Sequence, residues 1–168
     1  PRSGLPAGRL IEEQLRRIIR EEEWALIDLR INHFSAFNDV YGFVAGDDVL
    51  RFSAMLLGEI VDKFGSPDDF IGHAGGDNFI IISTSEASPN ITKELKERFD
   101  EEVQTHYNFM DREQGFIQPL GAEGDADKSP LMTVSAGVVS PKEHRFADIR
   151  EITEMAAEAR RQDATVEA

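Results

Sequence analysis

Two short segments of the sequence carry side chains that could bind a small polar ligand or a metal ion. Between Asn38 and Asp47, an amide and several carboxylates surround a loop that enters a helix. From Gly75 to Phe79, two glycines precede an acid at the tip of a predicted β-hairpin. An amide both donates and accepts hydrogen bonds, and a carboxylate accepts them or ligates a hard cation. The chemistry therefore depends on whether the fold brings the two segments together.

The elements that would position these segments follow from apolar periodicity. Residues 24–32 alternate between apolar and polar types, which predicts a strand. A short helix is expected around His33 to Asp39. A longer helix follows, with Val49, Leu56, Ile60 and Phe64 on its buried face. Two strands, Phe70 to Ala74 and Phe79 to Ser83, are expected on either side of the glycine pair.

The rest of the chain adds three helices and a second strand pair. One helix is expected to start at Ser3-Gly4-Leu5-Pro6 and to carry Leu10, Ile11, Leu15, Ile18 and Ile19 on one face. Two more are expected after Ser88-Pro89 and from about Ala147 to Arg161. The strand pair comprises Gly115 to Leu120 and Leu131 to Ser140, separated by a polar tip at Gly121 to Ser129. Residues 162–168 are expected to be a frayed tail. This order predicts an α+β fold with helices packed on a mostly antiparallel sheet.

Composition narrows the functional class. The 168 residues fit one domain, and the formal net charge of −14 argues against binding a nucleic-acid backbone. No apolar run approaches the roughly 20 residues of a membrane span. Cysteine is absent, which is consistent with a reducing compartment, and we expect a cytoplasmic location. Because the chain starts with Pro1, we expect it to be a fragment of a larger multidomain signalling protein.

Four motifs in order give the chain a family resemblance. They are Ser3-Gly4-Leu5-Pro6, Arg30 to Asp47 with its Asn38-Asp39 and Gly46-Asp47 pairs, Gly75-Gly76-Asp77-Asn78-Phe79, and Thr133-Val134-Ser135-Ala136-Gly137-Val138. In these motifs the chain resembles the GGDEF domains, which make cyclic di-GMP from two GTP molecules. The resemblance covers nearly the whole chain, and we expect residues 1–168 to form a single degenerate GGDEF domain. It implies a nucleotidyl-cyclase-like fold with a ferredoxin-like βαββαβ core and an extra strand pair.

The resemblance also implies roles for individual residues. Asn38 and Asp47 correspond to the family's guanine-binding pair, and an amide with a carboxylate can match guanine's carbonyl and N–H groups. Alternatively, Asn38 caps a turn and Asp47 occupies a first helical turn, where acids are favoured. The remaining nucleotide-binding positions implied by the family are Phe34, Gly75, Gly76, Asp77 and Asn78.

The chain departs from the family at the metal site. The family binds magnesium through the first acid of the strand motif and the third residue of the hairpin signature. The hairpin acid is retained as Asp77, but Arg30 occupies the strand position, and a guanidinium cannot ligate magnesium. Asp28 is a poor substitute, because it lies roughly 7 Å away along the strand. We expect Arg30 to form an ion pair with Asp77 in the place of the metal, which leaves Asp77 as a vestigial catalytic residue.

Other departures from the family pattern also indicate a loss of catalysis. The usual Glu after the hairpin acid is Asn78, the basic residue after Phe34 is Ser35, and the second strand acid is Asn32. The family's last helix carries a Lys and an Arg that meet phosphates, and this helix has no clear counterpart: Arg160 and Arg161 either serve in their place or lie on a solvated helix face. The family's inhibitory product site needs an Arg where this chain has Ser66, so only Asp69 remains and no feedback site is expected.

These observations leave three interpretations. The first is a degenerate, catalytically inactive GGDEF domain, acting as a regulatory or protein-interaction module with residual GTP binding. The second is an active diguanylate cyclase with Asp77 and Asp28 around magnesium, the one case in which we expect a cofactor. The third is a dimerisation scaffold of a response regulator that binds no nucleotide. Expected partners are GTP, other domains of the same chain or a signalling protein, and a second copy in a homodimer; neither nucleic acid nor a membrane span is expected.

Overall fold

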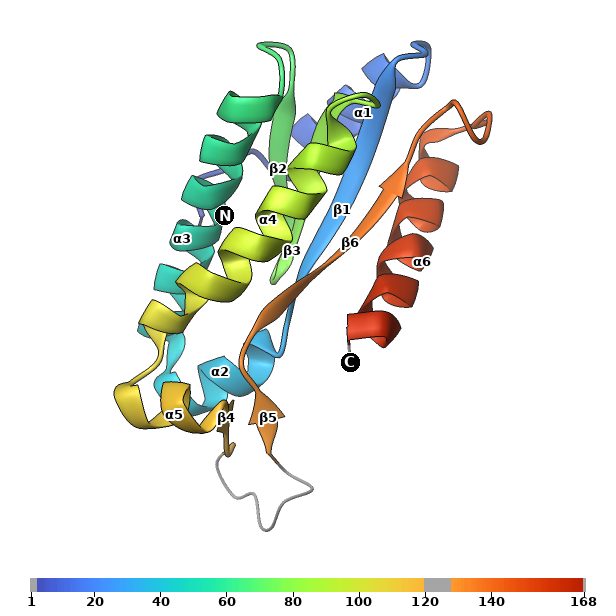
Figure 1. Ribbon diagram of the computed structural model, residues 1–168. Helices are drawn as coiled ribbons and strands as arrows, with labels where there is room; N and C mark the ends of the chain where they lie inside the picture. The colour runs from blue at the N-terminus through green and yellow to red at the C-terminus, as the bar shows by residue number, and fades with distance from the viewer. Residues whose placement is uncertain (1–2, 120–127, 168) are drawn as a thin grey trace.

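The computed structural model describes residues 3–119 and 128–167 (Figure 1). Its helices are α1 (Arg9–Ile18), α2 (Phe34–Tyr41), α3 (Phe43–Phe64), α4 (Ser88–Glu102), the 3-10 helix η1 (Val103–His106), α5 (Phe109–Gln114) and α6 (Ile149–Glu167). Its strands are β1 (Trp24–Asn32), β2 (Phe70–Gly75), β3 (Asn78–Thr84), β4 (Phe116–Ile117), β5 (Ser129–Pro130) and β6 (Thr133–Val139).

The main sheet is four-stranded, and every pairing in it is antiparallel. The strand order is β2-β3-β1-β6, so β1 lies between the hairpin and β6. Along the chain, β1, α2 with α3, β2, β3, α4 and β6 form the predicted βαββαβ core. Arg30 in the last third of β1 is opposite Asn78 on β3 and Ser135 on β6. The α+β fold class is therefore confirmed.

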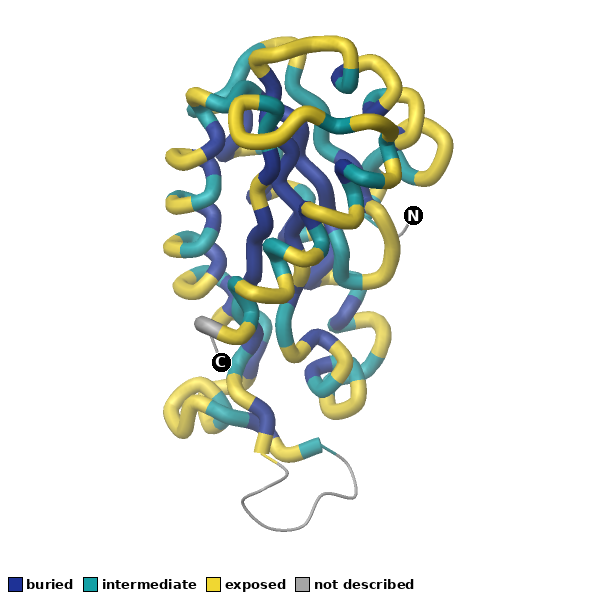
Figure 2. The backbone as a smooth tube through the Cα atoms, turned by 90° about the vertical axis from the view of Figure 1, so that its right-hand side faces the viewer, coloured by how far each residue is buried: buried dark blue, intermediate teal, exposed yellow. Residues whose placement is uncertain are grey.

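Helices cover both faces of the sheet, because β1 has apolar side chains on both of its faces. Ile27, Leu29 and Ile31 pack with α2, α3 and α4 in one core cluster. On the opposite face, Trp24 and Leu26 pack with α1 and α6 in a second cluster. Figure 2 shows the strands buried between these layers, with the outer turns of the helices exposed. Towards the end of β1, polar side chains replace the apolar ones on this second face.

The second strand pair differs from the prediction. Only β4 and β5 form it, as a separate two-stranded sheet with Phe116 opposite Pro130. Residues 133–139, predicted to belong to this pair, instead form β6 and pair with β1. The reason is the apolar pattern of β6, whose buried side chains complete the main core. Most of the predicted polar tip, residues 121–127, lies outside the described residues.

The last helix is longer than predicted. We expected it to end near Arg161 with a frayed tail, but α6 continues to Glu167. The carboxylate of Asp163 accepts hydrogen bonds from Lys96 Nζ (2.9 Å) on α4 and from the backbone N–H of Ala136 (2.8 Å) on β6. These bonds anchor the last turns of α6 to two neighbouring elements. Within the described residues, no helix is long and apolar enough to cross a bilayer.

Candidate functional site

A cavity of about 310 Å³ lies between the end of β1, the start of α2 and the tip of the β2–β3 hairpin. We call it the β1–α2 pocket. Its lining residues are Arg30, Ile31, Asn32, His33, Phe34, Ser35, Asp77, Thr133 and Ala164. The predicted strand and hairpin residues Arg30 and Asp77 therefore meet at one pocket, with the N-terminus of α2 as its floor.

The glycine pair shapes the hairpin so that Asp77 reaches this pocket. Gly75 pairs with Asn78, and Gly76 takes a left-handed conformation (φ 48°) that allows the tight connection. The carbonyl of Asp77 accepts a hydrogen bond from the backbone N–H of Ile31 (3.0 Å), which ties the hairpin tip to β1.

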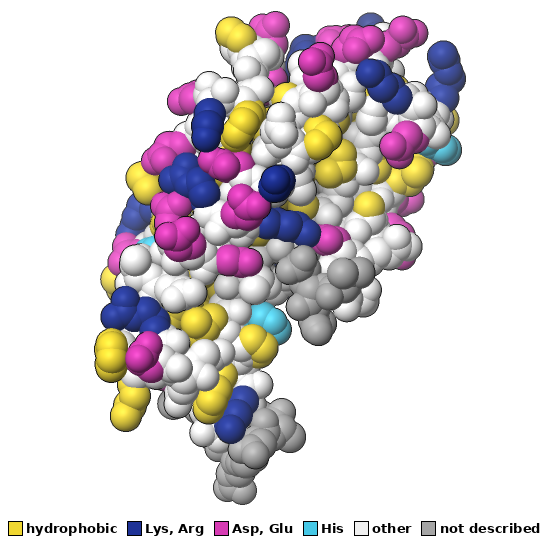
Figure 3. Space-filling view, viewed as in Figure 1, with side chains coloured by type: hydrophobic (Ala, Val, Ile, Leu, Met, Phe, Trp, Pro, Cys, Tyr) yellow, Lys and Arg dark blue, Asp and Glu magenta, His cyan; other side chains and the backbone are white. Residues whose placement is uncertain are grey.

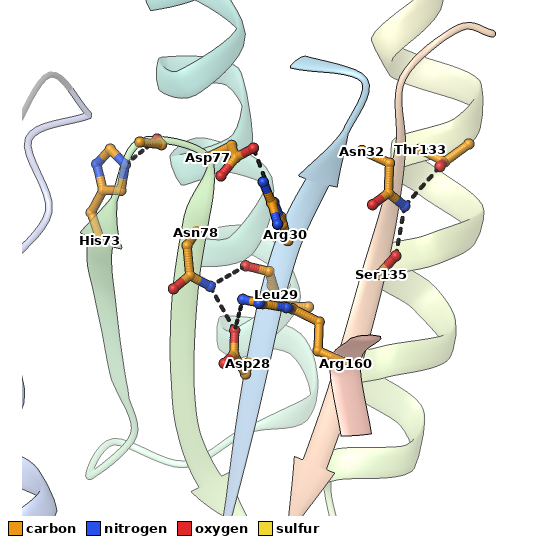
Figure 4. Close-up of polar contacts among 11 residues, drawn as sticks. Asp28, Leu29, Arg30, Asn32, His73, Asp77, Asn78, Thr133, Ser135 and Arg160 are labelled. Carbon is orange, nitrogen blue, oxygen red and sulfur yellow. Dashed lines mark hydrogen bonds and ion pairs between the residues drawn. The ribbon is translucent and has the colours of Figure 1, made fainter. Parts of the chain in front are cut away.

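The predicted ion pair between Arg30 and Asp77 is present (Figure 4). Arg30 Nε donates to Asp77 Oδ2 at 3.2 Å. The Arg30 side chain is 53% exposed and that of Asp77 is 24% exposed. A positively charged group thus lies beside the hairpin acid, within the pocket.

A second ion pair lies on the same face of β1, at Asp28, two residues before Arg30. Arg160 Nη1 on α6 donates to Asp28 Oδ1 at 3.1 Å, and the two side chains are 11% and 8% exposed (Figure 4). Asn78 Nδ2 donates to the same Asp28 oxygen (2.6 Å) and to the carbonyl of Leu29 (2.7 Å). Burial raises the pKa of Asp28 above 3.8, opposed by the hydrogen bond from Asn78 and the charge of Arg160.

This buried network gives Arg160 and Asn78 structural contacts, and it corrects the expectation of a solvated helix face at Arg160. Arg160 neither faces solvent nor lines the β1–α2 pocket, because its guanidinium is held by Asp28. The side-chain nitrogen of Asn78 donates to Asp28 and to the carbonyl of Leu29, which braces the sheet below the pocket, and nucleotide binding by Asn78 stays a prediction. Arg161 lies on the surface, paired with Glu158 on the same helix.

The two predicted base-binding residues come together at the corner between α2 and α3. Asn38 lies one helical turn after Ser35, which lines the pocket, so both side chains share a face of α2. Oδ1 of Asn38 is buried and has no hydrogen-bond partner among the described residues. It packs directly on Gly46, where a Cβ atom would overlap with it. Asp47 is the next residue of α3.

Two other predicted positions have local structural roles. Both oxygens of Asp69 accept hydrogen bonds: from the N–H (3.0 Å) and hydroxyl (2.8 Å) of Ser66, and from the hydroxyl of Ser83 (2.6 Å). These three hydrogen bonds stabilise the connection from α3 to β2. That the chain lacks an inhibitory product site stays a prediction. Phe34 lines the pocket, although most of its side chain is buried in the core.

Sequence reasoning missed the support of the hairpin by His73. Its Nε2 lies 2.8 Å from the carbonyl of Gly76, and its Nδ1 lies 2.8 Å from the hydroxyl of Ser3. The imidazole stacks on Phe79, with ring centroids 4.4 Å apart. One signal for this contact was present in the sequence. The predicted hairpin tip at Gly75-Gly76 places His73 opposite Phe79, and side chains opposite each other on paired strands interact.

A magnesium ion does not fit these residues. Asp77 is paired with Arg30, and Asp28 is paired with Arg160 and bonded by Asn78. Within residues 3–119 and 128–167 there is no cluster of three or more His, Cys, Asp or Glu side chains that could hold a metal ion. Magnesium requires near-octahedral oxygen ligation. The Arg30 guanidinium lies beside Asp77, the one carboxylate among the described residues that line the pocket, and opposes the binding of a cation there.

Comparisons with known proteins agree with the motifs. Residues 3–164 match the family described as diguanylate cyclase, GGDEF domain. Diguanylate cyclase DgcP of Escherichia coli is 27% identical over 157 residues, which cover 85% of this chain and 44% of DgcP. The chain thus spans less than half the length of that relative. The signaling protein YkoW of Bacillus subtilis is 43% identical over 56 residues, or 33% of this chain and 6% of YkoW.

Solved structures share the fold. The GGDEF domain of DgcB from Caulobacter crescentus, in complex with c-di-GMP, aligns with a TM-score of 0.69 at 20% identity, covering 98% of this chain and 88% of that one. Diguanylate cyclase SiaD from Pseudomonas aeruginosa, in complex with its activator SiaC, aligns with a TM-score of 0.70 at 19% identity, covering 99% and 57%.

Proposed function

Since this chain belongs to the GGDEF domain family of diguanylate cyclases, we propose that it is a degenerate member: a regulatory module that binds guanine nucleotide without making cyclic di-GMP. Its role is then in cyclic di-GMP signalling, as a sensor of nucleotide that communicates with other domains or a partner protein. The complex of SiaD with its activator offers a precedent for such contacts within the family. A cytoplasmic location and a homodimer belong to this proposal as well.

One observation carries the loss of turnover: the pairing of Arg30 with Asp77. Joining two GTP molecules requires attack of a 3′-hydroxyl on an α-phosphate, with divalent ions to neutralise charge on the phosphate oxygens. GGDEF cyclases use Mg²⁺ when active, whereas here the residues at the corresponding place pair with each other. Arg30 can neutralise negative charge on a phosphate. Unlike a metal ion, it cannot bind the oxygen of the attacking 3′-hydroxyl and so make it a better nucleophile.

Asn38 supports the retained nucleotide binding. A buried polar atom without a partner costs roughly 1–3 kcal/mol of stability. The unpaired Oδ1 of Asn38 therefore suits an N–H donor from a ligand, and guanine offers such donors at its edge. Gly46 keeps the space that this amide occupies.

The test combines turnover with binding. The purified domain is incubated with GTP and Mg²⁺ or Mn²⁺ and assayed for cyclic di-GMP, and GTP binding is measured by calorimetry in parallel. We expect binding without product. Product formation that Asp77→Ala abolishes would establish an active cyclase instead, and neither binding nor product would favour the scaffold interpretation.

The variant Asn38→Ala tests whether Asn38 contributes to GTP binding. We expect it to weaken GTP binding about tenfold, the effect of losing one or two good hydrogen bonds to the base. Because Oδ1 has no partner in the described protein, the same variant should unfold at an unchanged or higher urea concentration. Asn90→Ala, at an exposed position on α4, serves as the control and should change neither quantity. A loss of stability in Asn38→Ala without weaker GTP binding would assign Asn38 a purely structural role.

A further inference from the structure

We infer that the β1–α2 pocket binds the phosphate groups of its nucleotide through Arg30 and without a divalent cation. This inference rests on the proposed nucleotide binding and specifies its chemistry. In this pocket, a protein-borne cation takes over the charge neutralisation that a metal ion would supply. The ligand class is a nucleoside di- or triphosphate in its metal-free form.

The geometry of Arg30 leaves its phosphate-binding edge available. The guanidinium lines the pocket and is 53% exposed. Among the described residues it donates only from Nε, to Asp77, so both Nη groups remain open to a ligand. A guanidinium has five N–H donors in a planar fork that matches two oxygens of a phosphate. Asp77 therefore orients Arg30 from one side while the other side can bind an oxyanion.

The same arrangement disfavours a metal-bound nucleotide. Asp77 is the only carboxylate among the described residues that line the pocket, and Arg30 already neutralises it. A divalent cation entering here would be repelled by the guanidinium at short range. Magnesium also reduces the negative charge of the triphosphate, which weakens its attraction to Arg30. Binding should therefore be as tight in a chelator as in magnesium, or tighter.

Asp77 gives the sharpest contrast between a metal-dependent and an arginine-dependent site. In a metal-dependent site, Asp77→Asn removes a ligand and weakens nucleotide binding. In the site proposed here, Asp77 repels the incoming phosphates and competes for Arg30, so Asp77→Asn should strengthen GTP binding about threefold or more. The exposed ion pair contributes little to folding, so the variant should remain folded.

The experiment is calorimetric titration of the domain with GTP in EDTA and, separately, in excess Mg²⁺ at equal ionic strength. Arg30→Gln should weaken binding in EDTA about tenfold, since it removes a charge-assisted hydrogen-bond donor. Arg16→Gln is the matched control, because Arg16 is likewise exposed and ion-paired, but lies on α1 and outside the pocket. Arg16→Gln should bind GTP like the unmodified domain in both conditions.

The outcomes separate this inference from the proposed function. Tight binding in EDTA that depends on Arg30 and increases in Asp77→Asn supports the inference. Binding that appears only with Mg²⁺, or that Asp77→Asn abolishes, overturns it while leaving nucleotide binding intact. The absence of GTP binding in both conditions overturns the proposed nucleotide binding itself, and the inference with it.

Discussion

The buried pair between Arg160 and Asp28 is the polar contact with the largest expected effect on stability. Arg160→Met removes the positive partner and leaves a buried carboxylate that is bonded only by Asn78 among the described residues. Breaking a buried ion pair in this way costs about 3–5 kcal/mol. We expect the free energy of unfolding, measured with urea at neutral pH, to fall by about this amount.

The pH dependence of that loss follows from the raised pKa of Asp28. Burial raises the pKa above the ordinary 3.8, so the folded state binds a proton more tightly than the unfolded state. The contribution of Asp28 to stability is therefore complete below pH 3.8 and is lost as the pH rises through the folded pKa. Because Arg160 lowers that pKa, Arg160→Met raises it further, and the destabilisation should shrink towards acidic pH. Asp28→Asn/Arg160→Met is the control, and its unfolding should lack this pH dependence; equal pH profiles for both variants would contradict the assignment.

At the level of residues, the sequence predicted the ion pair at the hairpin tip but not the pair below it. Arg30 and Asp77 sit in recognisable motifs, so a strand and a hairpin were enough to bring them together. Arg160 is separated from Asp28 by 132 positions, and its burial depends on how α6 packs against the sheet. Helical periodicity gives the face of a helix, but not which strand residue that face meets. The bond from Asn78 to Asp28 was not predicted for the same reason, since it depends on strand register.

At the scale of secondary-structure elements, α6 packs closely on β6. A Cβ atom at Gly137 would overlap with backbone atoms of Ala156 and Arg160, so the helix lies directly on the strand. Gly137→Ala should push α6 outwards and cost about 1–3 kcal/mol of unfolding free energy. It should also expose Arg160 and loosen its bond to Asp28.

Gly58→Ala on α3 is the matched control for this contact. No atom lies within 4 Å of a Cβ built there, and alanine favours helix over glycine by about 1 kcal/mol. The two substitutions should therefore change the urea midpoint in opposite directions. If Gly137→Ala were as stable as the unmodified domain, the packing of α6 on β6 would be looser than described.

Elements with strong local signals were predicted well, and those defined by tertiary contacts were not. The bounds of β1 match residue for residue, because alternating side chains mark a strand clearly. The pairing of β6 with β1 rather than with residues 115–120 is a long-range choice that the local pattern does not contain. The extra length of α6 likewise depends on Asp163, whose partners Lys96 and Ala136 lie on other elements.

On the scale of the whole molecule, the net charge of −14 is the dominant electrostatic feature. Acidic and basic side chains are interspersed on the face seen in Figure 3. Several ion pairs of the described residues are exposed, for example Arg16–Glu12 and Arg161–Glu158. Exposed pairs contribute about 0–1 kcal/mol each, whereas an excess of acids repels itself more strongly in the compact state. We therefore expect the melting temperature to rise as NaCl increases from about 0.01 M to about 0.15 M, since the Debye length shortens from about 30 Å to about 8 Å. A falling melting temperature would mean that attractive pairs outweigh the excess charge.

Because this charge also attracts Mg²⁺ to the surface at large, stabilisation by Mg²⁺ should be matched by NaCl of equal ionic strength, and should persist in Asp77→Asn.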